Sequence, residues 1–240
     1  MLYKNKIIAI IPARSGSKGL KNKNLRILNK KPLIYYPIKS LKRLKYIDKI
    51  LVSTDSNKII KKIKTLGVST PFLRPKKISL DNTKSDKVIT HALKFLKKKG
   101  EVYDYLIYLE PTSPLTTSKD IDISLKYLIK KTKKADSLVC IDKNILGHPD
   151  YSVIKNKNKI IFPLNKKFSS NPRQSLRDVF YFTGNLYISK CPTFLKNKTF
   201  YQKKRTIGYQ FEKWKSLEID DIYDLKFAEQ IMKLKKKIYE

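Results

Sequence analysis

Short apolar runs rich in β-branched residues alternate with amphipathic segments along most of this 240-residue chain, and this alternation limits the folds available to it. The first run, residues 7–11, has no polar position, as is typical of a parallel strand buried on both faces. Further strands are predicted at residues 50–53, 105–109 and 137–141. Strand–helix–strand units with right-handed crossovers predict an α/β fold with a doubly wound, mostly parallel sheet, whose ligands lie at the carboxyl ends of the strands.

Apolar spacing and helix-end residues predict the helices between these strands. Ser56 can cap a helix that ends near Gly67, and Pro32 lies where a helix over residues 33–44 begins. The other expected elements are an extended segment at 71–73, helices at 85–99, 118–131 and 221–238, and strands at 185–189 and 207–211. All of them fit one domain over residues 1–240.

The alternation stops at Asp142, where the chain becomes polar and turn-prone until about Tyr181. Few long apolar faces occur in this stretch, so it does not continue the main sheet. We interpret residues 142–182 as an excursion from that sheet, a small β arm within the domain.

The formal net charge of +34 is typical of proteins that bind nucleic acids or anionic membranes. However, the lysines are spread through every segment beside many Asn and Ile, as an AT-rich genome produces, and no nucleic-acid-binding module occurs. We therefore attribute the charge to composition and expect no specific nucleic-acid partner. A basic nucleic-acid-binding protein on the same fold is the alternative from another class.

Cysteine content and hydropathy bear on the compartment. The chain has two cysteines, no secretory leader pattern, and no apolar run near the ~20 residues that cross a bilayer. These features predict a cytoplasmic protein without a membrane partner. His91 and His148 have no companions that would form a catalytic triad or a zinc site, so acid–base catalysis by histidine is not expected.

The first strand leads into a basic loop that contains glycine, from Pro12 to Asn24. Its glycines allow a tight turn that brings backbone N–H groups towards an anion, and its cations can hold a triphosphate and stabilise departing pyrophosphate. The loop lacks both the Walker A pattern and the dinucleotide G-x-G-x-x-G pattern. By its residues alone, an ordinary basic loop between a strand and a helix is an equally good interpretation.

Two acids near the carboxyl end of the chain, Glu218 and Asp220, alternate on an extended stretch. Alternation places both carboxylates on one side, where they could bind a hard cation such as Mg²⁺ or Mn²⁺ with phosphate oxygens completing the shell. The competing interpretation is that Asp220 or Asp221 caps the final helix.

The loop from Pro12 to Asn24 resembles the signature of the CMP-sialic acid synthetases, the N-acylneuraminate cytidylyltransferases. Other segments are similar to that family in order and spacing: Ser53-Thr54-Asp55, Leu73-Arg74-Pro75 followed by Asp81, Leu109 to Leu115, Arg173-Gln174, Gly184-Asn185 and Glu218-Ile219-Asp220. The resemblance runs from about Ile7 to Glu229. It implies a Rossmann-like fold of the nucleotide-diphospho-sugar transferase type and a homodimer, with residues 142–182 as an arm for dimerisation or the sugar site.

The activity that the resemblance implies is transfer of CMP from CTP to the anomeric hydroxyl of a sialic-acid-like nonulosonic acid, with release of pyrophosphate. Arg173 would bind the sugar carboxylate through a bidentate guanidinium. By its residues alone, Arg74 would be a solvated surface arginine. The implied nucleotide-binding residues are Ala13, Arg14, Ser15, Gly16, Lys18, Asn24, Arg74 and Ser85; the sugar-binding residues are Glu110, Thr112, Arg173, Gln174 and Asn185; the catalytic residues are Arg14, Lys23, Arg173 and Asp220; and the metal ligands are Glu218 and Asp220.

Two residues depart from the family's pattern: Glu110 stands where relatives commonly carry Gln, and Thr116 where many carry Arg. An ionised glutamate accepts hydrogen bonds and donates none, so Glu110 would suit a sugar that offers hydroxyl or ammonium donors and would repel a carboxylate. N-acetylneuraminate, legionaminate and pseudaminate therefore stay open as substrates. The eight-carbon Kdo ranks last, because Kdo-specific relatives differ in the first loop.

Overall fold

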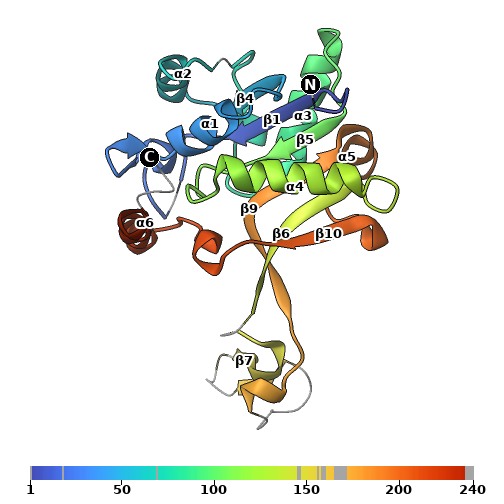
Figure 1. Cartoon of the computed structure of the whole chain (residues 1–240). Coiled ribbons are helices and arrows are strands. Elements are labelled where there is room, and N and C mark those ends of the chain that lie inside the picture. Colours follow the sequence, from blue (N-terminus) through green and yellow to red (C-terminus); the bar gives the residue numbers. More distant parts are fainter. Residues whose placement is uncertain are drawn as a thin grey trace.

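The computed structural model describes residues 2–17, 19–68, 70–144, 147–155, 157, 161–164 and 172–235. Its centre is a six-stranded sheet in the order β10-β6-β9-β5-β1-β4 (Figure 1). β9 runs antiparallel to its neighbours β5 and β6, and the other pairs are parallel, so the predicted α/β fold with a mostly parallel sheet is confirmed. The strands are β1 (Ile7–Pro12), β4 (Lys49–Ser53), β5 (Tyr105–Tyr108), β6 (Ser137–Lys143), β9 (Phe180–Lys190) and β10 (Thr206–Gln210).

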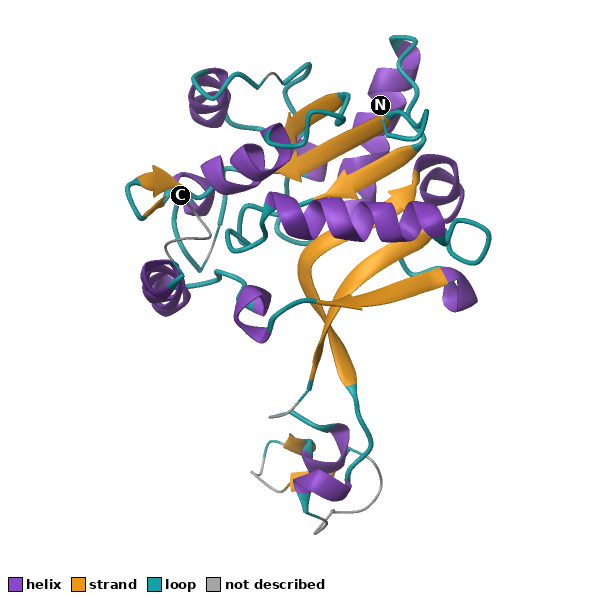
Figure 2. Cartoon of the chain, in the orientation of Figure 1, coloured by secondary structure: helices purple, strands orange, loops and turns teal. Residues whose placement is uncertain are grey.

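Helices cover both faces of this sheet (Figure 2). Because successive side chains of a strand point to opposite faces, Ile7 and Ile11 of β1 pack with α1, α2 and α4, whereas Ile8 and Ile10 pack with α3 and α5. β1 is therefore buried on both sides, as its lack of polar residues predicts. The helices are α1 (Tyr35–Lys42), α2 (Asn57–Lys64), α3 (Ser85–Lys98), α4 (Ser118–Lys130), α5 (Cys191–Asn197) and α6 (Ile222–Leu234).

Local capping explains where several helices begin and end. Ser56 caps α2 and accepts a hydrogen bond of 3.4 Å from the backbone N–H of Ile59. Gly67, with a φ of 65°, follows α2 and adopts the left-handed conformation that suits glycine. The sequence did not predict α5, whose seven residues are too few to establish a helical period. Residues 71–73, expected to be extended, form bends outside the sheet.

A small third core positions the carboxyl-terminal part of the chain. It joins α6 to the hairpin of β2 (Ile27–Leu28) and β3 (Lys31–Pro32), with buried Leu28, Ile219 and Leu225 among its members. The backbone N–H of Ile219 also donates to the carbonyl of Thr112 over 2.8 Å. These contacts hold residues 217–220 beside the loops that follow β1 and β5.

β6 and β9 continue past the sheet as a two-stranded ribbon, paired as far as Lys143 and Phe180. The ribbon carries a small arm that projects from the body (Figure 1). This arm occupies the predicted excursion, and its role in dimerisation or sugar binding stays a prediction. The arm holds η3 (Pro149–Tyr151), β7 (Val153–Lys155), β8 (Ile161–Pro163) and η4 (Arg173–Ser175), and the remaining single-turn helices are η1 (Lys23–Leu25), η2 (Lys76–Ile78), η5 (Lys203–Arg205) and η6 (Lys213–Ser216).

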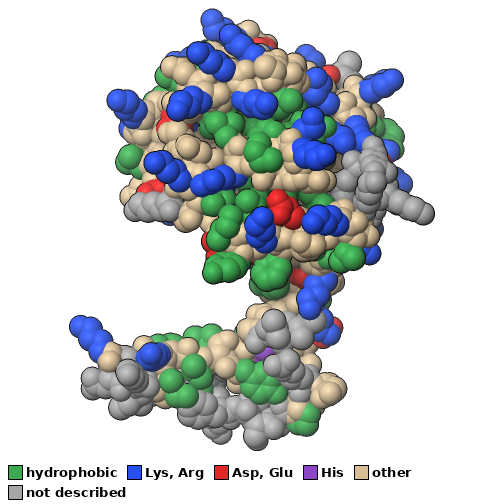
Figure 3. Space-filling view, turned by 90° about the vertical axis from the view of Figure 1, so that its left-hand side faces the viewer, with side chains coloured by type: hydrophobic (Ala, Val, Ile, Leu, Met, Phe, Trp, Pro, Cys, Tyr) green, Lys and Arg blue, Asp and Glu red, His purple; other side chains and the backbone are tan. Residues whose placement is uncertain are grey.

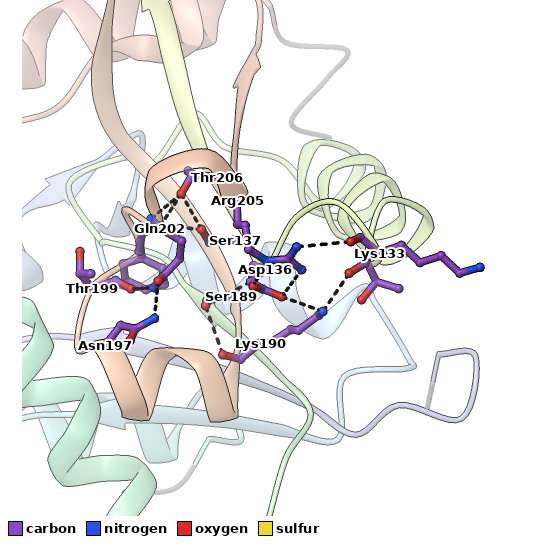
Figure 4. A network of polar contacts seen from close by, with 12 residues as sticks. Lys133, Asp136, Ser137, Ser189, Lys190, Asn197, Thr199, Gln202, Arg205 and Thr206 are labelled. Carbon is purple, nitrogen blue, oxygen red and sulfur yellow. Dashed lines mark hydrogen bonds and ion pairs between the residues drawn. The ribbon is translucent and has the colours of Figure 1, made fainter.

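A polar network stabilises the edge of the sheet at which the parallel strands begin (Figure 4). Asp136, just before β6, accepts hydrogen bonds from Arg205 and, over 2.8 Å, from Lys190. The hydrogen bond from Arg205, followed by that from Lys190, lowers the pKa of Asp136 to about 2.

Figure 3 shows Lys and Arg spread across one face of the body, not gathered in a stripe. In the described part of the chain, no helix has the length and apolar character to cross a membrane.

Candidate functional site

A cleft of about 370 Å³ lies where β1, β4 and β5 end, at the edge where the alternating fold predicts ligands. The loop after β1, the loop before α3, the loop after β5 and the stretch before α6 form its walls. Its charged and polar lining includes Arg14, Lys23, Asn24, Arg74, Ser85, Glu110, Thr112, Glu218 and Asp220. Most of the predicted site residues are thus brought together, although they come from segments far apart in the sequence.

Hydrogen bonds with Asp55 and Asn24 hold the first loop in place. The backbone N–H and the hydroxyl of Ser15 each donate to the carboxylate of Asp55 over 2.8 Å. The buried Asn24 donates from its side-chain amide to the carbonyl of Arg14 over 2.9 Å. Ser15 therefore shapes the loop, and Asn24 both shapes it and lines the cleft.

Other residues predicted to bind the nucleotide differ in their placement. The side chain of Ala13 is buried in the sheet core, so only its backbone could face a nucleotide. Gly16 belongs to the loop but is not among the residues that line the cleft. Lys18 lies outside the described residues. Ser85, at the first position of α3, lines the cleft as expected.

Two cationic side chains of the loop form ion pairs with carboxylates from other segments of the chain. Arg14 forms an ion pair with Asp81, and the ammonium of Lys23 donates to Asp220 over 2.8 Å and to the carbonyl of Ile219 over 3.1 Å. Asp220 is mostly exposed, at 75% of its side chain, whereas Lys23 is mostly covered, at 15%. Phosphate groups that enter the cleft would compete with Asp81 and Asp220 for these two cations.

Arg74 is buried, with only 3% of its surface exposed, so its interpretation as a solvated surface arginine is wrong. Its Nε donates to the hydroxyl of Ser79 over 3.1 Å, but its Nη2 has no partner in the described part of the chain. Burial lowers the pKa of this guanidinium. An unpaired buried donor costs roughly 1–3 kcal/mol, and Arg74 lines the cleft, so its environment favours an anionic or carbonyl ligand.

The acids before α6 divide into two groups with different roles. Asp221 caps the helix and accepts from the backbone N–H groups of Tyr223 and Asp224 over 2.7 and 3.0 Å, and Asp224 accepts in return from Asp221 over 3.1 Å. The interpretation that Asp220 or Asp221 caps this helix is therefore confirmed for Asp221, and Asp220 is not the cap. Glu218 and Asp220 both line the cleft, free of that structural role.

Glu218 and Asp220 fit a hard divalent cation in their donor atoms and in their electrostatics. Burial raises the pKa of Glu218, and the negative charge of Asp220 is the next cause. A cation between the two carboxylates would relieve this repulsion. The described residues contain no cluster of three or more acids, histidines or cysteines, so phosphate and water oxygens would have to complete the coordination.

Glu110 stands at the junction of this cleft and a second cavity of about 490 Å³, because it lines both. The hydroxyl of Thr112 lies 3.4 Å from Oε2 of Glu110 and 3.3 Å from Oε1 of Glu218, so the single Thr112 hydroxyl proton serves one carboxylate at a time. Burial, and then the charge of Glu218, raises the pKa of Glu110 to about 7.

Two of the predicted sugar-binding residues, Gln174 and Asn185, do not line the cleft of their own chain. Gln174 lines a separate cavity of about 300 Å³ on the arm. Arg173 precedes it in η4, and its side chain lies outside the described part of the chain. Asn185 is buried, accepts from Thr183, and donates to the carbonyl of Lys215 over 3.3 Å. The hydrogen bond to Lys215 joins β9 to η6, so Asn185 has a structural role, and its contact with the sugar stays a prediction.

The second cavity contains functional candidates that the sequence did not reveal. Tyr187 of β9 and the neighbouring pair Phe200 and Tyr201 line it, together with Lys84 and Lys198. Alternation along β9 would have predicted that Tyr187 points to one face, but no local signal places Phe200 or Tyr201 beside it. Asp55 and Asp81 lie in segments that the sequence did single out, although without a role.

Known proteins are similar to the chain over nearly its whole length. The profile of the cytidylyltransferase family matches residues 8–240. The N-acylneuraminate cytidylyltransferase of Escherichia coli is 32% identical over 238 residues, which cover 97% of this chain and 53% of that protein. The pseudaminic acid cytidylyltransferase of Campylobacter jejuni is 28% identical over 230 residues, which cover 95% of this chain and 97% of that protein. The chain thus spans about half the length of the first relative and nearly all of the second.

A solved structure has the same fold. CMP-2-keto-3-deoxy-manno-octonic acid synthetase complexed with CTP superposes with a TM-score of 0.69, covering 96% of this chain and 99% of that chain. The two sequences are 16% identical, so this likeness concerns the arrangement of helices and strands.

Proposed function

Because the chain belongs to the cytidylyltransferase family, we propose that it transfers CMP from CTP to the anomeric hydroxyl of a sialic-acid-like nonulosonic acid and releases pyrophosphate. The observation that carries this proposal is the cleft at the carboxyl ends of the strands, where the cations of the first loop face Glu218 and Asp220. A triphosphate needs cations and a bound metal, and the cleft offers positions for both.

The nucleotide would be held mainly by charge. Arg14 and Lys23 would leave their carboxylate partners for phosphate oxygens, and the buried guanidinium of Arg74 would gain the acceptor that its Nη2 lacks. Cations beside the β- and γ-phosphates stabilise pyrophosphate as it departs. The protein's main contribution is therefore positioning and electrostatic stabilisation of an in-line displacement at the α-phosphorus.

Glu218 and Asp220 are the residues that would hold a divalent cation, Mg²⁺ or Mn²⁺. When bound, such a cation neutralises phosphate charge at the displacement. The exposed carboxylate of Asp220 would exchange its ion pair with Lys23 for this role, which leaves Lys23 for the phosphates.

The second cavity is suited to the sugar. It shares Glu110 and Ser85 with the nucleotide cleft, so a ligand in it can reach a phosphate in the first cavity. Aromatic side chains from Tyr187, Phe200 and Tyr201 can pack against the ring or its apolar substituents. N-acetylneuraminate, pseudaminate and legionaminate are all candidates, and the similarity to relatives that act on two of these sugars does not choose among them.

We also propose that the arm serves a second copy of the chain. Gln174 and the backbone of Arg173 lie on the arm, which projects from the body of the chain (Figure 1), and Gln174 does not line the cleft. In a homodimer, the arm of one subunit could bring these residues to the sugar cavity of the other. The alternative of a nucleic-acid-binding protein gains no support from the face seen in Figure 3, where the cations are dispersed.

The direct test is CTP-dependent release of pyrophosphate, assayed with Mg²⁺ and each of N-acetylneuraminate, pseudaminate, legionaminate and Kdo. Turnover with one of the nine-carbon sugars, abolished by a metal chelator and by Asp220→Asn, is the expected result. Release of pyrophosphate with none of the four sugars would count against the proposed reaction.

A further inference from the structure

Glu110 occupies an electrostatically unusual position. Although the chain carries a formal net charge of +34, neither Glu110 nor Glu218 forms an ion pair with any described cation. Glu110 is held instead by hydrogen bonds from the hydroxyls of Tyr108 and Thr112. A carboxyl group that is shielded from water and has no ion-pair partner costs folding free energy. The place of Glu110 at the junction of two cavities therefore indicates a function.

The position of Glu110 limits which part of a sugar can touch it. With the nucleotide in the first cavity as proposed, a sugar in the second cavity would present its reacting oxygen at the junction, where Glu110 and Ser85 line both cavities. In a nonulosonic acid the anomeric carbon carries two polar substituents, a hydroxyl that attacks and a carboxylate. A carboxylate side chain accepts a hydrogen bond from the hydroxyl and repels the anion.

Two lysines also line the second cavity. Lys84, at the residue before α3, and Lys198, which ends α5 with a φ of 52°, both line it. Neither lysine forms an ion pair with a carboxylate among the described residues. Asp86 lines the same cavity, so its lining carries charge of both signs, and Glu110 is the acid that also borders the first cavity.

We propose that Glu110 is a specificity-determining residue that orients the anomeric carbon: it accepts the hydrogen bond of the anomeric hydroxyl and keeps the sugar carboxylate away from the junction of the two cavities. This inference rests on the proposed function and adds the class of substrate that fits. The substrate is a 2-ulosonic acid with a free anomeric hydroxyl, bound in one orientation. A glutamine could accept the same hydrogen bond but would not repel the carboxylate.

The test is a thermodynamic cycle between residue 110 and the anomeric hydroxyl. Binding is measured by calorimetry with Mg²⁺ and CDP, which carries no pyrophosphate leaving group, for the sugar that the wild type turns over and for its 2-deoxy analogue. We expect the wild type to bind the sugar about 10- to 100-fold more tightly than the analogue, as a hydrogen bond to a charged group provides. In Glu110→Ala this preference should fall to within about twofold.

Two further variants separate the role of Glu110 from a general loss of structure. Glu110→Gln keeps the shape and an acceptor, so part of the hydroxyl preference should return. Glu101→Ala removes an acid that pairs with Lys49, away from the cleft, and should keep the full preference. Thermal unfolding of each variant verifies that it is folded.

The outcomes distinguish this inference from the function on which it rests. An unchanged preference for the hydroxyl in folded Glu110→Ala, while the wild type turns the sugar over, would overturn the role of Glu110 alone. Absence of wild-type turnover with every nonulosonic acid would remove the proposed function, and the inference with it.

Discussion

Gly19 and Asp220 are in direct backbone contact: a Cβ atom on Gly19 would lie 2.7 Å from the carbonyl oxygen of Asp220. Real Cβ atoms do not approach a backbone oxygen so closely, so only glycine fits between the first loop and the acid pair. The ion pair between Lys23 and Asp220 joins the same two segments. This contact fixes the distance between the groups that would bind the phosphates and those that would bind the metal.

Gly19→Ala should therefore impair catalysis much more than folding. The added methyl group must push the loop away from residues 219 and 220, and a displacement near 1 Å in a phosphoryl-transfer site costs roughly 100-fold in rate. Gly16→Ala is the matched comparison, because its Cβ would meet nothing closer than 3.7 Å and should cost far less. Steady-state pyrophosphate release measures both, and equal losses in the two variants would contradict the role of the Gly19 contact.

Asp220 and Asp221 are neighbours with separate roles, and a pair of substitutions should separate them. Asp220→Asn should lower kcat by about 100-fold or more, since it removes a proposed metal ligand, and leave the unfolding temperature nearly unchanged. Asp221→Ala should lower the free energy of unfolding by about 1 kcal/mol through loss of the cap on α6, and leave most of the activity. Kinetics as a function of Mg²⁺ concentration and thermal unfolding measure the two effects. A loss of stability in Asp220→Asn together with a loss of activity in Asp221→Ala would show that the capping and metal roles are exchanged.

Removal of the buried cation at Arg74 should weaken nucleotide binding without loss of stability. Arg74→Met keeps much of the side-chain volume, and it removes an unpaired buried donor whose desolvation is unfavourable. We expect the KM for CTP to rise about 10- to 100-fold and the unfolding temperature to stay level or increase. A large fall in unfolding temperature with an unchanged KM would show that Arg74 is structural.

Stability should depend on pH through Glu110. Its pKa is about 7 in the folded protein, above the ordinary value of 4.5, so the folded state retains a proton that the unfolded state releases. The group therefore lowers stability as pH rises from about 4.5 to 7, and the penalty is complete above that range. Without metal, Glu110→Gln should unfold at a temperature at least ~2 °C higher than the wild type at pH 8, and this gain should disappear near pH 4.5. A gain of equal size at both pH values would refute the titration of Glu110.

The fold was largely predictable because its signals are local. The uninterrupted apolar run of β1 and the cap at Ser56 each specify an element within a few residues, and both elements form as expected. The helix α5 was missed because seven residues with a proline at the start show no period. The antiparallel placement of β9 depends on its pairing with β5 on one side and β6 on the other, which no local pattern records.

The site was predictable in its charged residues and less so in its geometry. Arg14, Lys23 and Asp220 meet in one cleft as expected from the motifs. Burial of Arg74 could not be deduced, because a polar segment before a proline is equally consistent with a surface loop. The environment of Asn185 was also hidden, since its partner Lys215 lies thirty residues away in sequence.

The arm supports a last prediction, that the site is completed by a second subunit. Arg14→Ala should inactivate the nucleotide cleft of its own chain, and Arg173→Ala should disable the arm. If the arm serves the partner, a hybrid dimer of these two inactive variants has one site with both arginines intact. Because random exchange makes about half of the dimers hybrid, mixing should restore about a quarter of the wild-type activity.

Subunit mixing also excludes the simpler explanation that the arm folds back onto its own cleft. If Arg173 acted in its own chain, every site in the mixture would lack one of the two arginines, and no activity would return at any ratio of the variants. A mixture of Arg14→Ala with Asp220→Asn is the control. Arg14 and Asp220 line the same cleft of one chain, so every cleft in that mixture lacks one of the two residues and no activity can return. Recovery in the first mixture but not in the control is what an arm that reaches the second subunit requires.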